Sequence, residues 1–478
     1  MVLITFVVRT QDSIVNYSDF GNKSQDESSL GFYNIDKQYF LLIGNKKNIE
    51  NINVHVYDSI LIETRKNKLN LKGHDWIKSI YIHNKLVIFT SFTNSNNQEE
   101  LYVHTISNIG EMSSTTIITK TQNHGGYKAK YKVISSENQE KLIIFIEQAF
   151  YKEKNEKISI LYLDADFSIV NRLDKTLDRI DKNKKTNIPL ISNDGCLYIL
   201  KRHWDKGNKY YLYISYAGEF HETEIKLRNR KIAAMEYIID KSGNLILAGF
   251  FTSPIRFNFE GCFTFEYKKS THYSYKNEFI FPEKIINKFK SKKEIKSTGY
   301  GLDNFHSRKL ILDSIGNQYL ISEHHKFFHN KKDFKHIRKG IVAIKFTKRG
   351  KYIWGSPIIT NQIENNKKSS WSSFISYINN GRLNILYNVI NDDHHNNHDE
   401  KKTYSTYGEN ALYGANKIKF LNSGLTEQKP ILIYKNKSNQ KIALTHPILM
   451  KKNNTIFLIM QSEDKTKFRI VENFSNIH

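Results

Sequence analysis

The stretch DKSGNLILAGFF, residues 240–251, has a counterpart further along the chain in DSIGNQYLISEH, residues 313–324. Both begin with Asp-x-x-Gly-Asn, residues that form tight turns, in which the glycine supplies a positive φ. Both then continue into a short run rich in apolar and β-branched residues. A turn followed at once by such a run is typical of the second strand of a β-hairpin. The sequence therefore predicts two equivalent hairpins, far apart in one chain.

Similar runs, with hydrophobic period two and a preceding tight turn, recur along the whole chain. Another strand-like run lies ahead of each turn, and a second hairpin follows after a gap of variable length. The predicted unit has four antiparallel strands, and its second strand begins near residues 40, 86, 142, 197, 245, 318, 383 and 456. Four-stranded units repeated at this spacing indicate a β-propeller. We expect an all-β fold, with one propeller domain over residues 1–478 and about eight blades or, alternatively, seven.

The last of these units lacks its outermost strand. Either LITFVVR, residues 3–9, or SIVNYSDF, residues 13–20, would supply this strand and close the ring from the N-terminus. Residues 1–8, MVLITFVV, also resemble the apolar end of a secretory signal that has lost its basic region. The two interpretations of the first eleven residues, signal remnant and β-strand, remain open. With the first, the protein is exported to the periplasm, the outer surface or the medium; with Met1 as the true start, it is cytoplasmic.

The composition excludes some classes of protein. Of the 478 residues 39% are hydrophobic, so the chain can bury a large core and is not intrinsically disordered. Its two cysteines, Cys196 and Cys262, lie in separate strand-like runs without metal-binding spacing, which excludes a disulfide scaffold. No run reaches the length of a transmembrane helix. We expect a monomer.

The chain is strongly basic. It has 72 Lys and Arg against 48 Asp and Glu, a net charge of +24. Such a charge is typical either of general surface solvation or of an anionic partner such as nucleic acid or acidic polysaccharide. The lysines are scattered through every segment without a continuous stripe, so the charge alone does not decide between the two.

Three segments carry a family resemblance: IIDKSGNLILAGFF (238–251), LILDSIGNQYLISEH (310–324) and KGIVAIKFTKRGKYIWGSPI (339–358). They resemble the bacterial β-propeller repeat D-x-x-G-N-x-Y-x-x-G, which precedes a strand ending in a Gly-x-x-x-Trp hairpin. The order of motifs from 231 to 390 is similar to that of an uncharacterised exported β-propeller family. Thr347 departs from the pattern, since an acidic residue is common there. The resemblance covers about a third of the chain; it implies the fold and export, and brings no assigned activity.

Long insertions in the repeats predict where a binding surface lies. Residues 325–338 and 390–412 join the second and third strands of the sixth and seventh blades, and residues 283–305 connect the fifth blade to the sixth. These connections emerge on one face of a propeller, and long loops in compact folds are usually functional or disordered. We therefore expect the protein to recognise a ligand through the long loops of blades five to seven. The basic run KFKSKKEIKS within 283–305 is either a grip for an anionic polymer or a solvated surface.

The candidate ligand-binding residues of these loops are His324, His325, His329, His336, Tyr404 and Tyr407. Imidazole and carboxylate groups bind zinc and similar divalent ions when three or four of them converge. The polar run of 392–399 supplies candidate metal ligands at Asp392, Asp393, His394, His395 and His398. A solvated loop without metal is the alternative, and no cofactor is otherwise expected. Trp354, which closes a hairpin, is expected to pack in the core.

No nucleophile, metalloprotease or nucleotide-binding motif occurs. Glu323, at the end of a predicted inner strand, is the single acid that we consider as a catalytic residue; a buried hydrogen-bonded role is its alternative. We expect a non-catalytic binding or scaffold module that recognises a protein or a glycan. A polysaccharide-acting hydrolase that uses Glu323 and a second carboxyl group is one alternative, and nucleic-acid binding through the positive charge is another.

Overall fold

The computed structural model describes residues 8–10, 13–20, 28–36, 38–45, 50–58, 63–149, 155–180, 187–203, 209–216, 219–253, 258–329, 334–364, 374–379, 381–392, 411–434, 442–443, 449–452, 455–462 and 468–472. The chain divides into two compact units. The first, called the 24–226 unit, comprises residues 24–226. The second, called the 227–478 unit, comprises residues 227–478 together with residues 1–23.

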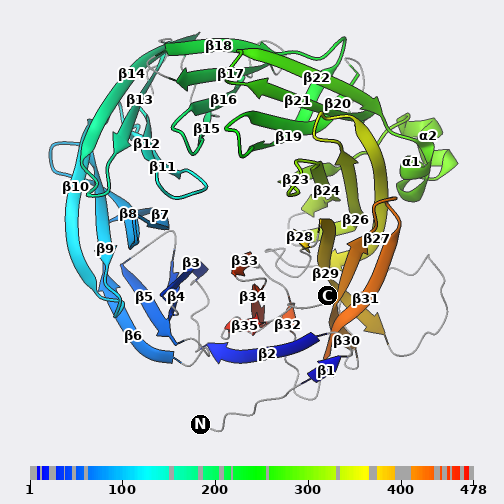
Figure 1. The fold of residues 1–478 in the computed structure, drawn as a ribbon, viewed down its shortest axis with the longest axis horizontal. Helices are drawn as coiled ribbons and strands as arrows, with labels where there is room; N and C mark the ends of the chain where they lie inside the picture. Colours follow the sequence, from blue (N-terminus) through cyan, green and yellow to red (C-terminus); the bar gives the residue numbers. More distant parts are fainter. Residues whose placement is uncertain are drawn as a thin grey trace. The chain divides into compact units, whose positions relative to one another are not determined.

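The described residues of the 24–226 unit form four antiparallel sheets, each made of four strands that follow one another in the chain (Figure 1). Their bounds are β3 Ser28–Ile35, β4 Gln38–Gly44, β5 Asn51–Tyr57 and β6 Glu63–Asn70; β7 Asp75–Ile82, β8 Lys85–Thr93, β9 Gln98–Ile106 and β10 Met112–Gln122; β11 Lys130–Ser135, β12 Leu142–Glu147, β13 Asn155–Leu163 and β14 Ile169–Ile180; and β15 Asn187–Ile191, β16 Leu197–His203, β17 Lys209–Tyr216 and β18 Glu219–Ile225.

The 227–478 unit continues the pattern with three sheets of consecutive strands, drawn from green to orange in Figure 1. They comprise β19 Lys231–Ile239, β20 Leu245–Thr252, β21 Gly261–Lys268 and β22 Tyr273–Ile280; β23 Phe305–Leu312, β24 Gln318–His324, β25 Lys326–His329, β26 Phe334–Phe346 and β27 Tyr352–Glu364; and β28 Phe374–Asn379, β29 Arg382–Asp392, β30 Ala411–Phe420 and β31 Thr426–Tyr434. The helices α1 Glu283–Phe289 and α2 Lys292–Thr298 lie between β22 and β23.

The last sheet combines both ends of the chain. It contains β1 Val8–Thr10, β2 Ser13–Phe20, β32 Ile442–Ala443, β33 Leu449–Lys452, β34 Thr455–Ser462 and β35 Phe468–Glu472. Strand β2 pairs antiparallel with β35, so SIVNYSDF is the N-terminal strand that completes the C-terminal sheet, as one of the two alternatives predicted. Seven sheets built from consecutive strands and this mixed terminal sheet make the chain an all-β propeller, in agreement with the predicted class.

The second strand of each sheet begins within two residues of its predicted start, from Gln38 in β4 to Thr455 in β34. The repeated motif Asp-x-x-Gly-Asn explains why the starts of β20 and β24 could be predicted. In both hairpins the aspartate, Asp240 or Asp313, accepts hydrogen bonds from the amides two and four residues later at 2.8–3.1 Å. Gly243 and Gly316 adopt φ values of 79° and 91°, which a side chain would strain. The motif Asp-x-x-Gly-Asn therefore forms the same turn in both hairpins.

The core lies between neighbouring sheets of each unit. In the 24–226 unit, β11–β14 packs with β7–β10 through Ile144 and Phe89, and with β15–β18 through Phe145 and Leu197. In the 227–478 unit, Tyr319, Trp354 and Phe420 pack together, with Trp354 stacked on Phe420 at 5.4 Å, so Trp354 is a core residue as predicted. Cys196 and Cys262 are free and fully buried, as expected of small apolar residues.

Neighbouring sheets are also tied by a repeated polar contact. A lysine on the first strand of one sheet donates to a backbone carbonyl on the first strand of the next: Lys78 to Val133 at 3.0 Å, Lys132 to Asn187 at 2.6 Å, and Lys309 to Ser376 at 3.1 Å. Burial lowers the pKa of Lys78 and of Lys309. Part of the high lysine content therefore serves the fold, by satisfying carbonyl groups between sheets.

Two insertions differ from the sequence-based expectation. Residues 283–305 contain α1 and α2, although no amphipathic helix was predicted, because seven-residue helices are too short to show a clear period. Residues 325–338 are not a loop: β25 and the first part of β26 pair as a hairpin that extends beyond β24. The polar residues at the centre of that segment hid the strand-forming residues on both sides. The prediction of one domain over residues 1–478 stays a prediction.

Candidate functional site

The hairpin of β25 and β26 is the insertion for which the structure gives most detail. Strand β26 has 13 residues; its second half pairs with β24 and its first half with β25. The pairing register shifts between Arg338 and Gly340, where the chain passes from one partner strand to the other. A second shift lies between Ser307 and Lys309 on β23. Arg308 lies at the shift on β23, Arg338 lies opposite Gln362 of β27 just before the shift on β26, and both side chains reach Glu323 near the end of β24.

Both arginines bind Glu323, the predicted catalytic candidate. Arg308 donates to Glu323 Oε2 from Nε at 3.1 Å and from Nη2 at 3.0 Å, and Arg338 Nη1 also contacts this oxygen. The Glu323 side chain is 6% exposed. Burial raises the pKa of Glu323, while the two guanidinium groups oppose this effect. Both guanidinium groups thus meet the same carboxylate oxygen, Oε2.

A histidine pair lies beside this cluster. His325 Nε2 and His336 Nδ1 are 2.9 Å apart, with ring centres 5.2 Å apart and ring planes at 16°. The two rings meet head to head, which is the geometry of one N–H donating to the other ring's nitrogen lone pair. A metal ion bound by both would need the lone pairs to converge beside the rings instead. The structure thus describes a hydrogen-bonded imidazole pair at this position.

Burial and nearby charges keep His325 neutral. Burial, together with Arg338, His336 and Arg308, lowers the pKa of His325 to about 4. His306, which sequence analysis did not single out, lies with its ring centre 6.0 Å from that of His325. Its Nε2 is 3.2 Å from the His325 carbonyl oxygen. Burial lowers the pKa of His306 too, so His306 and His325 are both uncharged at neutral pH.

The remaining predicted histidines separate. His324 is buried, its Nδ1 accepts from the Lys339 amide at 3.3 Å, and its ring contacts Phe305 edge to face at 5.5 Å. Burial lowers the pKa of His324 to about 4, so it is a neutral core histidine. His329 pairs through its backbone with Phe334 in the hairpin, and its side chain lies outside the described residues.

The predicted metal ligands are not brought together in the described part of the chain. Asp392 ends β29, where its backbone pairs with Ala411, and nothing is described of its side chain. Asp393, His394, His395, His398, Tyr404 and Tyr407 lie outside the described residues. The metal site and the two tyrosine contacts therefore stay predictions.

The hairpin also presents aromatic side chains that sequence analysis overlooked. Phe327 is 50% exposed and its ring lies 4.7 Å from that of His336. Phe328 is 43% exposed, and the Lys326 ammonium lies over it, 4.5 Å from the ring centre. Because successive side chains of a strand point to opposite faces, the two phenylalanines lie on opposite faces of the hairpin. We call the set Phe327, His325, His336, His306 and Arg308 the Phe327 face.

The Phe327 face can bind a flat apolar surface beside an anionic group. The ring of Phe327 offers stacking area supported by His336, and Arg308, with its side chain 39% exposed, offers a guanidinium that reaches solvent. Glu323 neutralises only one of the two guanidinium charges. These three side chains together carry one positive charge, next to the neutral imidazoles of His306 and His325, and Arg308 also lies near the carboxyl group of Glu236.

Comparison with known proteins finds only distant structural likenesses. No family model matches the chain, and no curated protein matches it. Among solved structures, the β-propeller domain of the trilobed protease from Pyrococcus furiosus is 10% identical, with 71% of this chain and 98% of that chain covered and a TM-score of 0.35. A polysaccharide lyase of family PL25, an ulvan lyase, is also 10% identical, with 80% and 89% covered and a TM-score of 0.38. The WD40 domain of SCAP from fission yeast is 7% identical, with 95% and 97% covered and a TM-score of 0.39. At these values the likenesses carry no argument about activity or ligand.

Proposed function

We propose that the protein is a propeller binding module for an acidic polysaccharide, and that the Phe327 face is its contact surface. The observation that carries the proposal is an exposed phenylalanine supported by His336, which is linked through His325 to the partly exposed Arg308. A sugar ring stacks its C–H face on an aromatic ring, and a planar guanidinium binds a carboxylate or sulfate through two hydrogen bonds. The net charge of +24 adds a long-range attraction for a polyanion.

The experiment is affinity electrophoresis of the whole protein in gels that contain polygalacturonate, dextran sulfate or unsubstituted dextran. Retardation is expected with the two acidic polymers and not with neutral dextran. Phe327→Ala is expected to weaken binding by about tenfold, since an aromatic contact of this kind contributes about 1–2 kcal/mol. Phe328→Ala is the matched control, because it removes the same ring from the opposite face of the same hairpin.

Two results would overturn the proposal. Equal retardation by dextran and by the acidic polymers would remove the role of charge. Equal losses in Phe327→Ala and Phe328→Ala would show that the Phe327 face has no special part. Displacement of the polysaccharide by low concentrations of duplex DNA would favour the nucleic-acid alternative, and capture of a protein without any polysaccharide binding would favour a protein partner.

A hydrolase remains a second candidate because Arg308 acts on two carboxyl groups. Burial raises the pKa of Glu323 and of Glu236 on β19, and the positive charge of Arg308 lowers the pKa of both groups. Glycoside hydrolases use two carboxyl groups, one of which has a raised pKa. Release of reducing ends from an acidic polymer, lost in both Glu323→Gln and Glu236→Gln, would support an enzyme; intact polymer after prolonged incubation would contradict it.

The proposal includes export, which the resemblance to exported propeller proteins and the apolar start MVLITFVV support. Among the described residues, no helix is long and apolar enough to cross a membrane. Acidic polysaccharides are abundant outside cells, so an exported protein would meet its ligand there. Cell fractionation with N-terminal sequencing tests this part: a mature chain that begins near Gln11 outside the cytoplasm supports export, and an intact Met1 in the cytoplasm contradicts it.

A further inference from the structure

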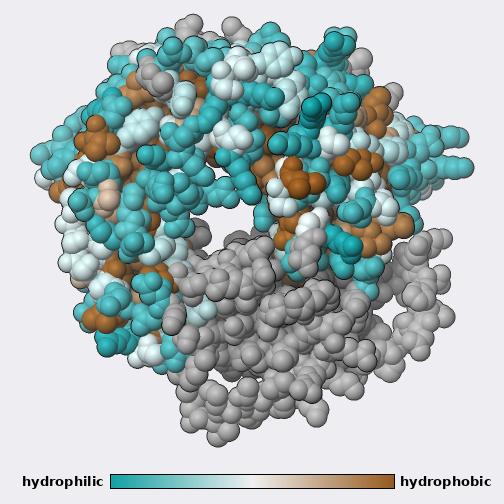
Figure 2. Space-filling view, in the orientation of Figure 1, coloured by the Kyte–Doolittle hydropathy of each residue, from teal (hydrophilic) through white to brown (hydrophobic). Residues whose placement is uncertain are grey.

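The helical insertion between β22 and β23 carries most of the local positive charge. Residues 283–296 contain six lysines and two glutamates. Five of the lysines are exposed, namely Lys284, Lys288, Lys292, Lys293 and Lys296. Hydrophilic residues project in Figure 2 where Figure 1 places α2, and none of the residues of this helix is buried. We call these five side chains the lysine platform.

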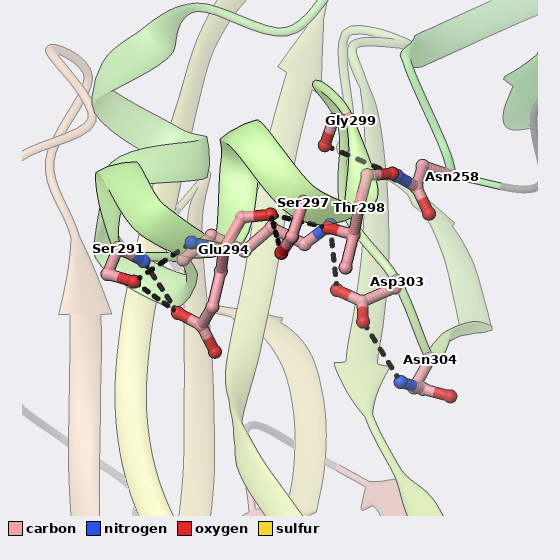
Figure 3. A network of polar contacts seen from close by, with 9 residues as sticks. Asn258, Ser291, Glu294, Ser297, Thr298, Gly299, Asp303 and Asn304 are labelled. Carbon is pink, nitrogen blue, oxygen red and sulfur yellow. Dashed lines mark hydrogen bonds and ion pairs between the residues drawn. The ribbon is translucent and has the colours of Figure 1, made fainter.

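The insertion is held rigidly on the sheet beneath it. Helix α1 buries Ile285, Ile286 and Phe289 in the core cluster that it shares with β20, β24 and β26, and Phe289 meets Phe305 edge to face at 4.9 Å. Helix α2 begins with a capping box, in which Ser291 Oγ accepts from the Glu294 amide at 3.2 Å and Glu294 accepts from the Ser291 amide at 2.7 Å (Figure 3). A short helix of this kind would be marginal without such contacts.

The end of the insertion is fixed as well. Asn258 donates to the Thr298 carbonyl at 2.6 Å and to the Gly299 carbonyl at 3.3 Å, as Figure 3 shows for Gly299. Lys290, the single buried lysine of the insertion, pairs with Asp303 at 3.2 Å and donates to Thr298 Oγ1 at 2.9 Å. These contacts fix the backbone that carries the lysine platform. Binding of a ligand there would therefore order only the lysine side chains.

Two acidic groups near the platform have internal partners, whereas Glu283 at the start of α1 is exposed. Glu294 is committed to the helix cap, and its backbone bond to Ser291 helps to lower the pKa of its carboxyl. Asp303 is committed to Lys290. None of the five platform lysines forms an ion pair with an acidic side chain in the described part of the chain. The exposed charged side chains of residues 283–296 are thus five lysines and two glutamates, an excess of positive charge over an evenly mixed surface.

The helices that carry the platform pack on β26, the strand that also forms the hairpin of the Phe327 face. Phe289 of α1 packs beside Gly340, where a Cβ would approach its ring to 2.9 Å. The neighbouring Lys339 lies near enough to Glu294 to contribute to its lowered pKa, and the Lys339 amide binds His324. Lys339 of β26 thus connects α2 with His324 at the end of β24.

We infer that the lysine platform is a second subsite for the same linear polyanion, which it grips through phosphate-, sulfate- or carboxylate-type charges without reading individual sugars. This inference rests on the proposed function, and it assigns the ligand as a polymer long enough to contact both the Phe327 face and α1–α2. Lysines suit such a role because their ammonium groups act as mobile point charges that follow an irregular chain. Binding releases counterions from the polymer, so the affinity depends steeply on salt.

The test compares salt dependence in three proteins with polygalacturonate as the probe. Binding constants of the wild type, of Lys292→Gln/Lys293→Gln/Lys296→Gln and of Phe327→Ala are measured by fluorescence anisotropy of labelled polymer between about 50 and 200 mM salt. The triple variant is expected to reduce the slope of log K against log salt by about 2, since each lost contact removes about 0.7–0.9. Phe327→Ala is expected to lower the affinity at every salt concentration by a constant factor, with the slope unchanged.

The control is Lys66→Gln/Lys68→Gln/Lys72→Gln, which removes the same charge from exposed lysines of the 24–226 unit. It is expected to keep the wild-type slope. An unchanged slope in the α2 variant, with polymer still bound, would overturn the lysine platform and leave the proposed function standing. Equal slope changes in the α2 variant and the control would attribute the effect to net charge and would also overturn the platform. Absence of polymer binding by the wild type would overturn the proposed function itself.

Discussion

Glu323→Gln separates the structural role of the Arg308–Glu323–Arg338 cluster from a purely catalytic one. The Arg338 side chain is 9% exposed and Glu323 is 6% exposed, so Glu323→Gln removes the negative charge that Glu323 supplies to a buried guanidinium. Breaking a buried pair from one side costs about 3–5 kcal/mol. The substituted amide would keep an acceptor oxygen for one hydrogen bond, and Arg308 is 39% exposed and contributes little after solvent screening. We therefore expect a loss of about 3 kcal/mol in the free energy of unfolding.

The assay is urea unfolding at neutral pH, followed by tyrosine and tryptophan fluorescence, with hydrogen exchange of the β24 and β26 amides as a local measure. The control is Glu427→Gln, which removes a 51% exposed carboxylate placed 3.8 Å from Lys419 and is expected to change stability by less than about 0.5 kcal/mol. The double variant Glu323→Gln/Arg338→Gln should be less destabilised than the sum of the single variants, because the unpaired charge is then gone. The reasoning would be refuted if Glu323→Gln had the same free energy of unfolding as the wild type and the same hydrogen-exchange protection of the β24 amides. An acid that serves only catalysis can be replaced without loss of stability.

Three further predictions concern the fold and its response to pH. Lys309→Met is expected to cost about 1–2 kcal/mol in urea unfolding, because the Ser376 carbonyl loses its donor; a neutral effect would show that the tie between sheets is incidental. Gly249→Ala is expected to cost more than about 3 kcal/mol or to prevent folding, since its Cβ would meet the Ala234 carbonyl oxygen; normal expression and stability would contradict the packing of β19 on β20. His324 has a pKa of about 4 in the folded chain and 6.5 as its ordinary value, so the unfolded chain binds more protons between these values and stability falls as pH drops from 6.5 toward 4. His324→Gln should flatten this fall by about one proton in pH-dependent urea titrations, and an unchanged pH profile would show that His324 titrates normally.

Turn chemistry made the fold predictable from the sequence. Asp240 and Asp313 begin turns whose hydrogen bonds depend only on residues two to four positions away, so local sequence is sufficient to place the strands that follow. Strand β2 was one of two alternatives predicted for the strand that the last sheet lacked, because both are period-two runs near the N-terminus. Short helices such as α2 depend instead on a cap and on tertiary contacts from Asn258, which the sequence does not reveal.

The candidate site was predictable only in outline. The insertion 325–338 was singled out by its length and its histidines, and His325 and His336 do meet there. Arg308 and Arg338 could not be foreseen, because they reach Glu323 through register shifts in strands of different hairpins. The grouping of His324 with His325 failed because neighbouring residues point to opposite sides, one into the core and one toward the hairpin.

The most direct test of the account is the binding of wild-type protein to polygalacturonate and to neutral dextran as salt is varied. The account predicts binding to the acidic polymer that weakens steeply with salt, and no measurable binding to dextran. Binding to both polymers alike, or binding to the acidic polymer that does not depend on salt, would contradict it.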